Sequence, residues 1–141
     1  MNAGRELDAV VAEKVMGFRW EEWQTGRGLY DQEGVKRGKR FHTNRLVFEE
    51  VPTMGVEAVP TRPLPHYSTD IAAAWEVVER FRVEPIGPRM VIVGCYDSAG
   101  LGNNGIGCEI KDGVGGSWQA FADTAPLAIC RAALQAVGVE A

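Results

Sequence analysis

The chain has 141 residues, of which 45% are hydrophobic and 24% are charged, and its formal net charge is −4. This length fits one domain around one core, and the composition is that of a folded globular protein rather than a disordered chain. The negative charge argues against a protein that coats long nucleic acid, because such binding requires a cationic surface. We therefore expect a single folded domain over residues 1–141.

The length of the apolar runs and the spacing of the cysteines narrow the class of protein further. The sequence has no apolar run of roughly 18 residues, the length that crosses a bilayer, and its start, MNAGRELDAVVAEK, lacks the features of a signal peptide. We expect a cytoplasmic protein with no membrane partner. Cys95, Cys108 and Cys130 fit neither a disulfide framework nor a zinc motif, so we expect buried, reduced thiols, no metal site and no cofactor.

The first predicted element is an amphipathic helix in GRELDAVVAEKVMGF, residues 4–18, that ends near Gly17. Leu7, Val11, Val15 and Phe18 recur at helical spacing and predict its buried stripe. The charged residues of this segment are expected to point mostly elsewhere: Arg5, Glu6, Asp8, Glu13 and Lys14.

Residues 19–66 are rich in proline and glycine and show no sustained periodicity except in RLVFEEV, residues 45–51. The pattern predicts a long loop or insertion with one short strand pair. A segment of this length in a compact domain is usually functional, so we expect specificity to lie here. Trp20 and Trp23 near its start are expected to anchor it to the core, although exposed tryptophans would favour an interface.

Within this segment, KRGKRFHTNR at residues 36–45 concentrates basic side chains around an aromatic ring and an imidazole. Guanidinium groups and an aromatic face suit a phosphate-bearing nucleotide, whereas the alternative is a solvated loop. The first group of candidate ligand-binding residues is therefore Lys36, Arg37, Lys39, Arg40, Phe41, His42 and Arg45.

The stretch PLPHYSTDIAAAWEVVERF, residues 63–81, contains a histidine, a serine and an aspartate close together. A hydrolytic triad needs an acid that orients a base against the nucleophile, which residues this close in sequence rarely achieve. Ser68, Thr69 and Asp70 are instead typical helix caps, and the free amides of a helix start can also bind phosphate. The second group of candidate ligand-binding residues is His66, Tyr67, Ser68 and Thr69.

A helix follows this cap, with a predicted buried face of Ile71, Ala74, Trp75, Val78 and Phe81. The segments RMVIVGCYD (89–97), GIGCEIKD (105–112) and GSWQAFAD (116–123) then predict three strands. GLGNNG at residues 100–105 matches a dinucleotide-binding pattern only formally, because a strand rather than a helix follows it. A last helix is predicted in DTAPLAICRAALQAVG, residues 123–138. Consecutive strands joined by short turns form an antiparallel meander, so the order predicts an α+β sandwich.

Three blocks, GRELDAVVAEKVMGF, LPHYSTDIAAAWEVVE and TAPLAICRAALQAVG, together resemble the phage ABA sandwich domain family, small phage and prophage proteins mostly of unknown function. The resemblance implies an α/β/α sandwich with a three-stranded or slightly larger antiparallel sheet covered by helices. It also implies a phage origin and a location in the host cytoplasm. It brings no established active site, and it offers no counterpart that can be carried over to residues 19–65.

The leading functional hypothesis is a non-catalytic ligand-binding protein, a sponge that sequesters a nucleotide-derived immune signal of the cyclic-dinucleotide or ADP-ribose type to evade host defence. This hypothesis draws on analogy with other small phage proteins. We expect no enzyme activity, and a homo-oligomer, because so small a sheet leaves an edge or a helix face to cover. The alternatives are a protein–protein interaction module that inhibits a host protein, and a small nucleotide hydrolase that uses His66 or His42.

Overall fold

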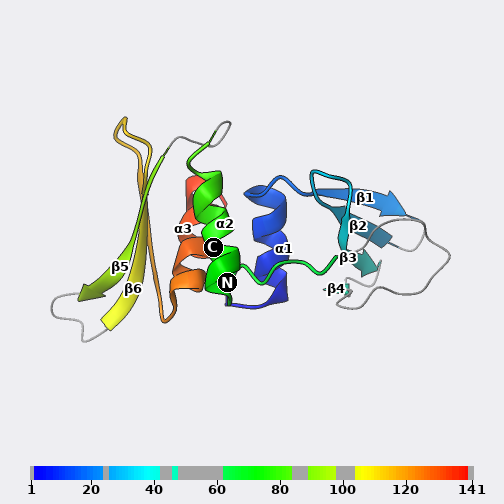
Figure 1. Ribbon diagram of the computed structural model, residues 1–141, viewed down its shortest axis with the longest axis horizontal. Coiled ribbons are helices and arrows are strands. Elements are labelled where there is room, and N and C mark those ends of the chain that lie inside the picture. Colours follow the sequence, from blue (N-terminus) through cyan, green and yellow to red (C-terminus); the bar gives the residue numbers. More distant parts are fainter. Residues whose placement is uncertain are drawn as a thin grey trace. The chain divides into compact units, whose positions relative to one another are not determined.

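The computed structural model describes residues 2–23, 26–41, 46–47, 62–83, 89–97 and 104–139. The chain divides into two compact units (Figure 1). Unit 1 comprises Met1–Met16 and His66–Ala141, and unit 2 comprises Gly17–Pro65. Unit 2 spans nearly the same residues as the insertion expected over 19–66, whereas the single domain expected over residues 1–141 stays a prediction.

In its described residues, unit 1 contains three helices and one antiparallel sheet. The helices are α1 (Arg5–Lys14), α2 (Ile71–Arg80) and α3 (Ala125–Ala136). Strands β5 (Met90–Asp97), β6 (Asn104–Lys111) and β7 (Ser117–Ala122) pair in that order. The expected helices and meander are therefore present, and the α+β class with a small antiparallel sheet covered by helices is confirmed.

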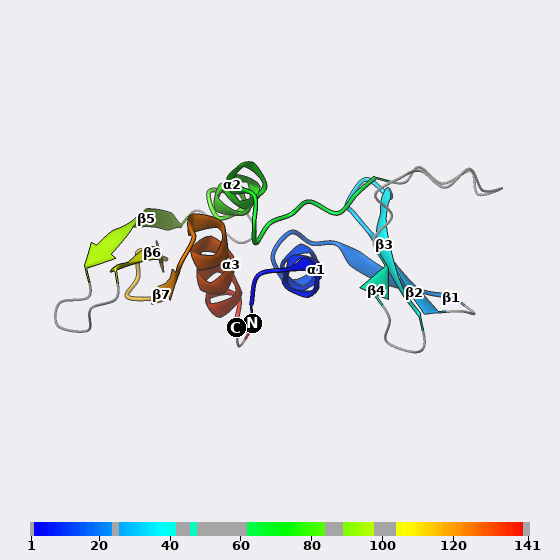
Figure 2. The ribbon, with the colours of Figure 1, turned by 90° about the horizontal axis from the view of Figure 1, so that it is seen from below.

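The register of this sheet decides which residues face the helices. Val93, Cys108 and Ala120 are direct partners across the three strands, and Cys108 and Ala120 are 0% and 5% exposed. Helix α3 packs on this face, mainly against β6 and β7. Figures 1 and 2 both show α2 and α3 in a layer between the sheet and α1.

Helix α3 is the centre of unit 1. It contacts the sheet on one side and α1 and α2 on the other, so it is apolar around most of its circumference rather than along a single stripe. Pro126 stands in its first turn, where a missing amide hydrogen costs no helical hydrogen bond. Its other buried residues are Ala128, Ile129, Cys130, Ala132, Ala133, Leu134 and Ala136.

The buried face of α2 differs from the predicted one. Ala74, Val78 and Phe81 are buried as expected, but Ile71 and Trp75 are each 52% exposed. The prediction was wrong at these two positions because the pattern also fits a face turned by about 60° around the helix axis. That face buries the small residue Ala73 and so allows α2 close to its neighbour. Two large apolar side chains are consequently left facing solvent.

The part of unit 2 that the structure describes is a four-stranded antiparallel meander rather than a loop with one strand pair. Its strands are β1 (Arg19–Trp23), β2 (Gly26–Tyr30), β3 (Lys36–Phe41) and β4 (Leu46–Val47). Leu29 at its centre is fully buried. Sequence reasoning missed these strands because glycines and basic residues interrupt the apolar alternation that usually marks a strand.

Two of the three cysteines meet the expectation of buried thiols, since Cys108 and Cys130 are both free and 0% exposed. Burial raises the pKa of each thiol to about 12. The side chain of Cys95 lies outside the described part of the structure.

We therefore predict that Cys108 and Cys130 resist thiol reagents in the folded protein. A pKa near 12 lowers the thiolate fraction at pH 8 about a thousandfold relative to an ordinary thiol. In a Cys95→Ser variant, titration with Ellman's reagent should detect both thiols in guanidinium and neither within minutes in native buffer. Rapid reaction of the native variant would contradict the packing described here.

Candidate functional site

Ser68 is a buried structural residue rather than the cap of α2. Its Oγ donates to Asp8 Oδ1 at 2.7 Å and accepts from the backbone N–H of Gly4 at 2.9 Å. Its own backbone N–H also donates to Asp8 Oδ1, at 2.8 Å. Arg5 Nη1 lies 3.0 Å from the other Asp8 oxygen. Both Asp8 and Ser68 are 0% exposed, so this network ties the start of α1 to the turn before α2.

Asp70 is the residue that caps α2, because its carboxylate accepts from the backbone N–H of Ala72 at 3.2 Å. The Ser68 hydroxyl is bonded to Asp8 and Gly4, not to His66 or Asp70. The helix-start interpretation of this stretch is therefore correct, and Ser68 is not held as a nucleophile.

The remaining candidate ligand-binding residues in this turn differ in their exposure to solvent. Tyr67 is 1% exposed, whereas His66 and Thr69 are exposed. The backbone N–H groups of Thr69 and Asp70 both donate to the His66 carbonyl, at 3.2 and 2.8 Å, so these amides are already satisfied. A ligand at this turn would therefore meet the side chains of His66 and Thr69 first.

The candidates of the basic segment lie on or beside β3. Lys36, Arg37, Lys39 and Arg40 belong to the strand, and Lys36 is only 3% exposed. Phe41 ends the strand, but its side chain, His42 and Arg45 lie outside the described residues. This group belongs to unit 2 and the group at 66–69 belongs to unit 1.

Arg37 is engaged inside unit 2. Its Nε donates to Asp31 Oδ2 and its Nη1 to the Pro63 carbonyl, each at 2.9 Å. Asp31 Oδ1 accepts from the backbone N–H groups of Glu33 and Val35, also at 2.9 Å. Burial by itself raises the pKa of Asp31, but the hydrogen bonds from Val35, Arg37 and Glu33 outweigh it and hold the pKa below its usual value. This network fixes the β2–β3 hairpin.

A second arrangement in unit 2 is better placed for a ligand. The guanidinium groups of Arg27 and Arg40 lie 5.3 and 5.8 Å from the centre of the Trp20 ring. The register pairs Glu22 with Arg27 and Arg27 with Arg40, and Trp20 stands two residues before Glu22 on β1. Because side chains alternate along a strand, those of Trp20, Arg27 and Arg40 project from the same face of the sheet as that of Glu22. We call Trp20, Arg27 and Arg40 the guanidinium–indole cluster.

Sequence reasoning included only Arg40 of this cluster. Arg27 stood outside the basic run, and Trp20 was interpreted as a packing anchor. The missing information was the strand pairing, since Trp20, Arg27 and Arg40 come from β1, β2 and β3 in turn.

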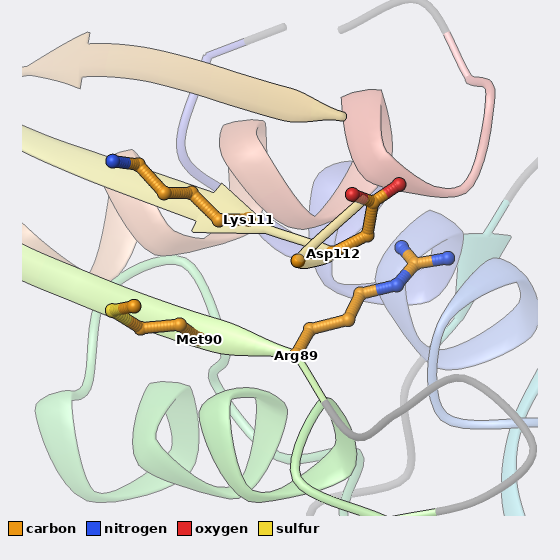
Figure 3. Close-up of a pocket in the computed structure, with 5 residues that line it drawn as sticks. Arg89, Met90, Lys111 and Asp112 are labelled. Atoms are coloured by element: carbon orange, nitrogen blue, oxygen red, sulfur yellow. The ribbon is translucent and has the colours of Figure 1, made fainter. Parts of the chain in front are cut away.

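A cavity of about 400 Å³ in unit 1 is lined by Arg89, Met90, Lys111, Asp112 and Gly113 (Figure 3). Lys111 and Met90 extend to one side of it, whereas Arg89 and Asp112, of opposite charge, extend to the other. The Arg89 guanidinium lies 5.7 and 5.1 Å from the Phe81 and Trp118 rings and donates to the Ala136 carbonyl at 3.2 Å. Arg89 thus joins the ends of two helices to the sheet and does not form an anion cage.

Among the described residues, no three or more histidine, cysteine or acidic side chains gather as a group that could hold a metal ion. In the same part of the chain, every helix is too short or too polar to cross a membrane.

Among the described residues, three helices on one side of a small antiparallel sheet define unit 1 as an α+β sandwich domain. The phage ABA sandwich domain model matches residues 9–134 of the chain. The chain therefore belongs to the phage ABA sandwich domain family, as its three sequence blocks predicted.

Comparison with solved structures shows a similar fold in a phage protein from Bacillus cereus ATCC 14579, known from a 2.0 Å crystal structure. The two chains are 23% identical with a TM-score of 0.54, over 100% of this chain and 94% of that one. At this identity the likeness shows the fold alone. No curated protein matches the chain.

We predict that the Asp8–Ser68 pair is strongly coupled. Asp8→Ala should lower the free energy of unfolding by about 3 kcal/mol, because it leaves buried donors without an acceptor. Since both substitutions remove the same contact, urea unfolding of the two single variants and the double variant with Ser68→Ala should give a coupling above about 1 kcal/mol. The control, Asp70→Ala, removes only an exposed cap and should cost about 1 kcal/mol. Additive effects at Asp8 and Ser68 would show that the network does not act as a unit.

We also predict that Asp31 makes stability depend on acid. Because its pKa is lowered on folding, its contribution is complete above the unfolded pKa, about 3.9, and is lost as pH falls through the folded value. Asp31→Asn should therefore be less stable than the parent at pH 7, and the difference should shrink towards pH 2. Urea titrations across this range, with Glu33→Gln as a matched loss of charge, would measure it. A difference that stays constant down to pH 2 would exclude this role.

Proposed function

We propose that this phage-family protein is a non-catalytic protein that binds a nucleotide-derived ligand through its phosphate groups. Its role is to sequester such a signal, of the cyclic-dinucleotide or ADP-ribose type, and so to protect the phage from host defence. A protein with this role acts in the host cytoplasm, where the signal is made.

The guanidinium–indole cluster is the observation that carries this proposal. A guanidinium that lies against an aromatic ring keeps its planar fork in a fixed orientation, and two such forks on one sheet face suit the oxygens of phosphate groups. The carboxylate of Glu22 lies 3.9 Å from Arg27 Nε, a longer and weaker contact than a charge-assisted hydrogen bond. At Arg27 a phosphate therefore competes with Glu22, a weakly held partner.

Binding of this kind needs no transition-state chemistry, because tight, stoichiometric capture follows from charge-assisted hydrogen bonds alone. The burial of Ser68 and its bond to Asp8 support a non-enzymatic role for this turn. Because His66 is exposed, its degree of burial does not distinguish a hydrolase that uses it from a sponge. The chemical state of the recovered ligand does, since a hydrolase cleaves the ligand and a sponge leaves it intact.

A second candidate function is inhibition of a host protein by direct contact. The observation in its favour is the pair Ile71 and Trp75, one helical turn apart on α2 and each 52% exposed. Exposed tryptophans on a helix are frequent anchors of protein interfaces. Capture of a host protein that is lost in a Trp75→Ser variant, without any small-molecule binding, would favour this function.

We predict that a nucleotide of this class raises the melting temperature. A ligand at 100 times its dissociation constant adds about 2.7 kcal/mol to stability. Arg40→Gln or Arg27→Gln should weaken binding at least about tenfold, or about 1.4 kcal/mol. Arg82→Gln, which removes an exposed guanidinium that pairs with Glu79, is the matched control and should bind like the parent.

The ligand recovered after heating the complex decides between sequestration and turnover. Intact ligand agrees with a sponge, whereas a hydrolysed one would revive the enzyme hypothesis. Absence of any shift across cyclic dinucleotides and ADP-ribose derivatives would overturn the proposal.

A further inference from the structure

The sheet of unit 1 has a second face, opposite the one on which α3 packs. Alternation along the strands places Met90, Ile92 and Phe121 on it, and these side chains are 58%, 37% and 46% exposed. Glu109 and Lys111 share this face, because the register pairs Ile92 with Glu109 and Met90 with Lys111. We call this surface the open face.

The charges of the open face are adjacent and of both signs. Lys111 Nζ lies 3.6 Å from Glu109 Oε1, and Ser117 Oγ donates to the same oxygen at 2.9 Å. A partner of one dominant charge would be matched by a surface of the opposite sign. One positive and one negative group side by side are instead complementary to a second copy, since a two-fold axis sets Glu109 of each copy against Lys111 of the other.

The open face also has a hollow at one end and an aromatic ring towards the other. The cavity described above is lined by Met90 and Lys111 (Figure 3). Phe121 pairs with Gly107, four residues along β7 from Ser117, which pairs with Lys111. The two-fold axis that exchanges Glu109 and Lys111 crosses the strands at Ile110, so it brings Phe121 of one copy to the Ser117 end of β7 in the other. An aromatic ring buried in this way is a common anchor of interfaces.

From these observations we infer that the open face is the interface of a symmetric dimer, occupied by a second copy of this chain. Gly107, which has no side chain, allows the partner to approach the sheet closely. Two strands of eight residues, about 27 Å long, and one of six residues, about 20 Å long, offer about 360 Å² per copy at a spacing of about 4.8 Å, below the roughly 800 Å² of a standard interface. The dimer accordingly dissociates in the micromolar range.

Sedimentation velocity of the full chain between about 1 and 100 µM tests this inference. The parent protein should shift from monomer to dimer within this range. Phe121→Ser or Ile92→Lys should weaken association at least tenfold, whereas Trp75→Ser, which alters an exposed apolar group on α2, should leave it unchanged. Circular dichroism melting identifies any variant that fails to fold.

Charge exchange gives a test that misfolding cannot imitate. Glu109→Lys alone and Lys111→Glu alone should each dissociate the dimer, because each variant meets its own charge across the axis. An equimolar mixture of the two variants should associate again. A parent that stays monomeric up to 100 µM, a dimer that only Trp75→Ser disrupts, or a mixture that associates no better than its components would each overturn the inference. The first of these results would point to a different protein as the occupant of the open face.

Discussion

The carboxylate of Asp8, fully removed from water, holds two distant parts of unit 1 together. It accepts two hydrogen bonds from Ser68 and one from Arg5, while Ser68 in turn accepts from Gly4. A buried charge is tolerated only when its hydrogen bonds are made, so the entry into α1 and the turn before α2 must form together. This requirement places both helices against α3 and, through α3, against the sheet.

In unit 2 a second carboxylate, that of Asp31, has a similar structural role. Asp31 accepts from two backbone amides of the hairpin and from Arg37, whose guanidinium also reaches the Pro63 carbonyl. In both units, therefore, an aspartate accepts hydrogen bonds from backbone N–H groups of a turn or hairpin, and these groups would otherwise be unsatisfied. Arg37 has a structural task, so the ligand-binding proposal depends on Arg27 and Arg40.

Sequence reasoning found the elements of unit 1 because their apolar residues pack against one another in one core. The spacing of these residues is therefore visible in the sequence. It missed the burial of Asp8, since a charged residue beside an apolar stripe looks solvent-facing until its partner Ser68, 60 positions away, is known. The predicted buried face of α2 is rotated from the observed one, because the alanines of this helix fit more than one apolar stripe. The guanidinium–indole cluster needs the pairing of three strands that basic residues and glycines conceal, so only Arg40 of its three members was anticipated.

The proposed function depends on the binding of phosphate groups at the guanidinium–indole cluster. An NMR titration of the full chain with inorganic pyrophosphate tests it most directly, because the Trp20 indole N–H and the Nε–H groups of Arg27 and Arg40 give separate signals. If phosphate binds there, these signals move together and saturate, and in an Arg40→Gln variant the remaining signals of Trp20 and Arg27 stay still. Movement confined to His66 and Thr69, or no saturable movement at all, would contradict it.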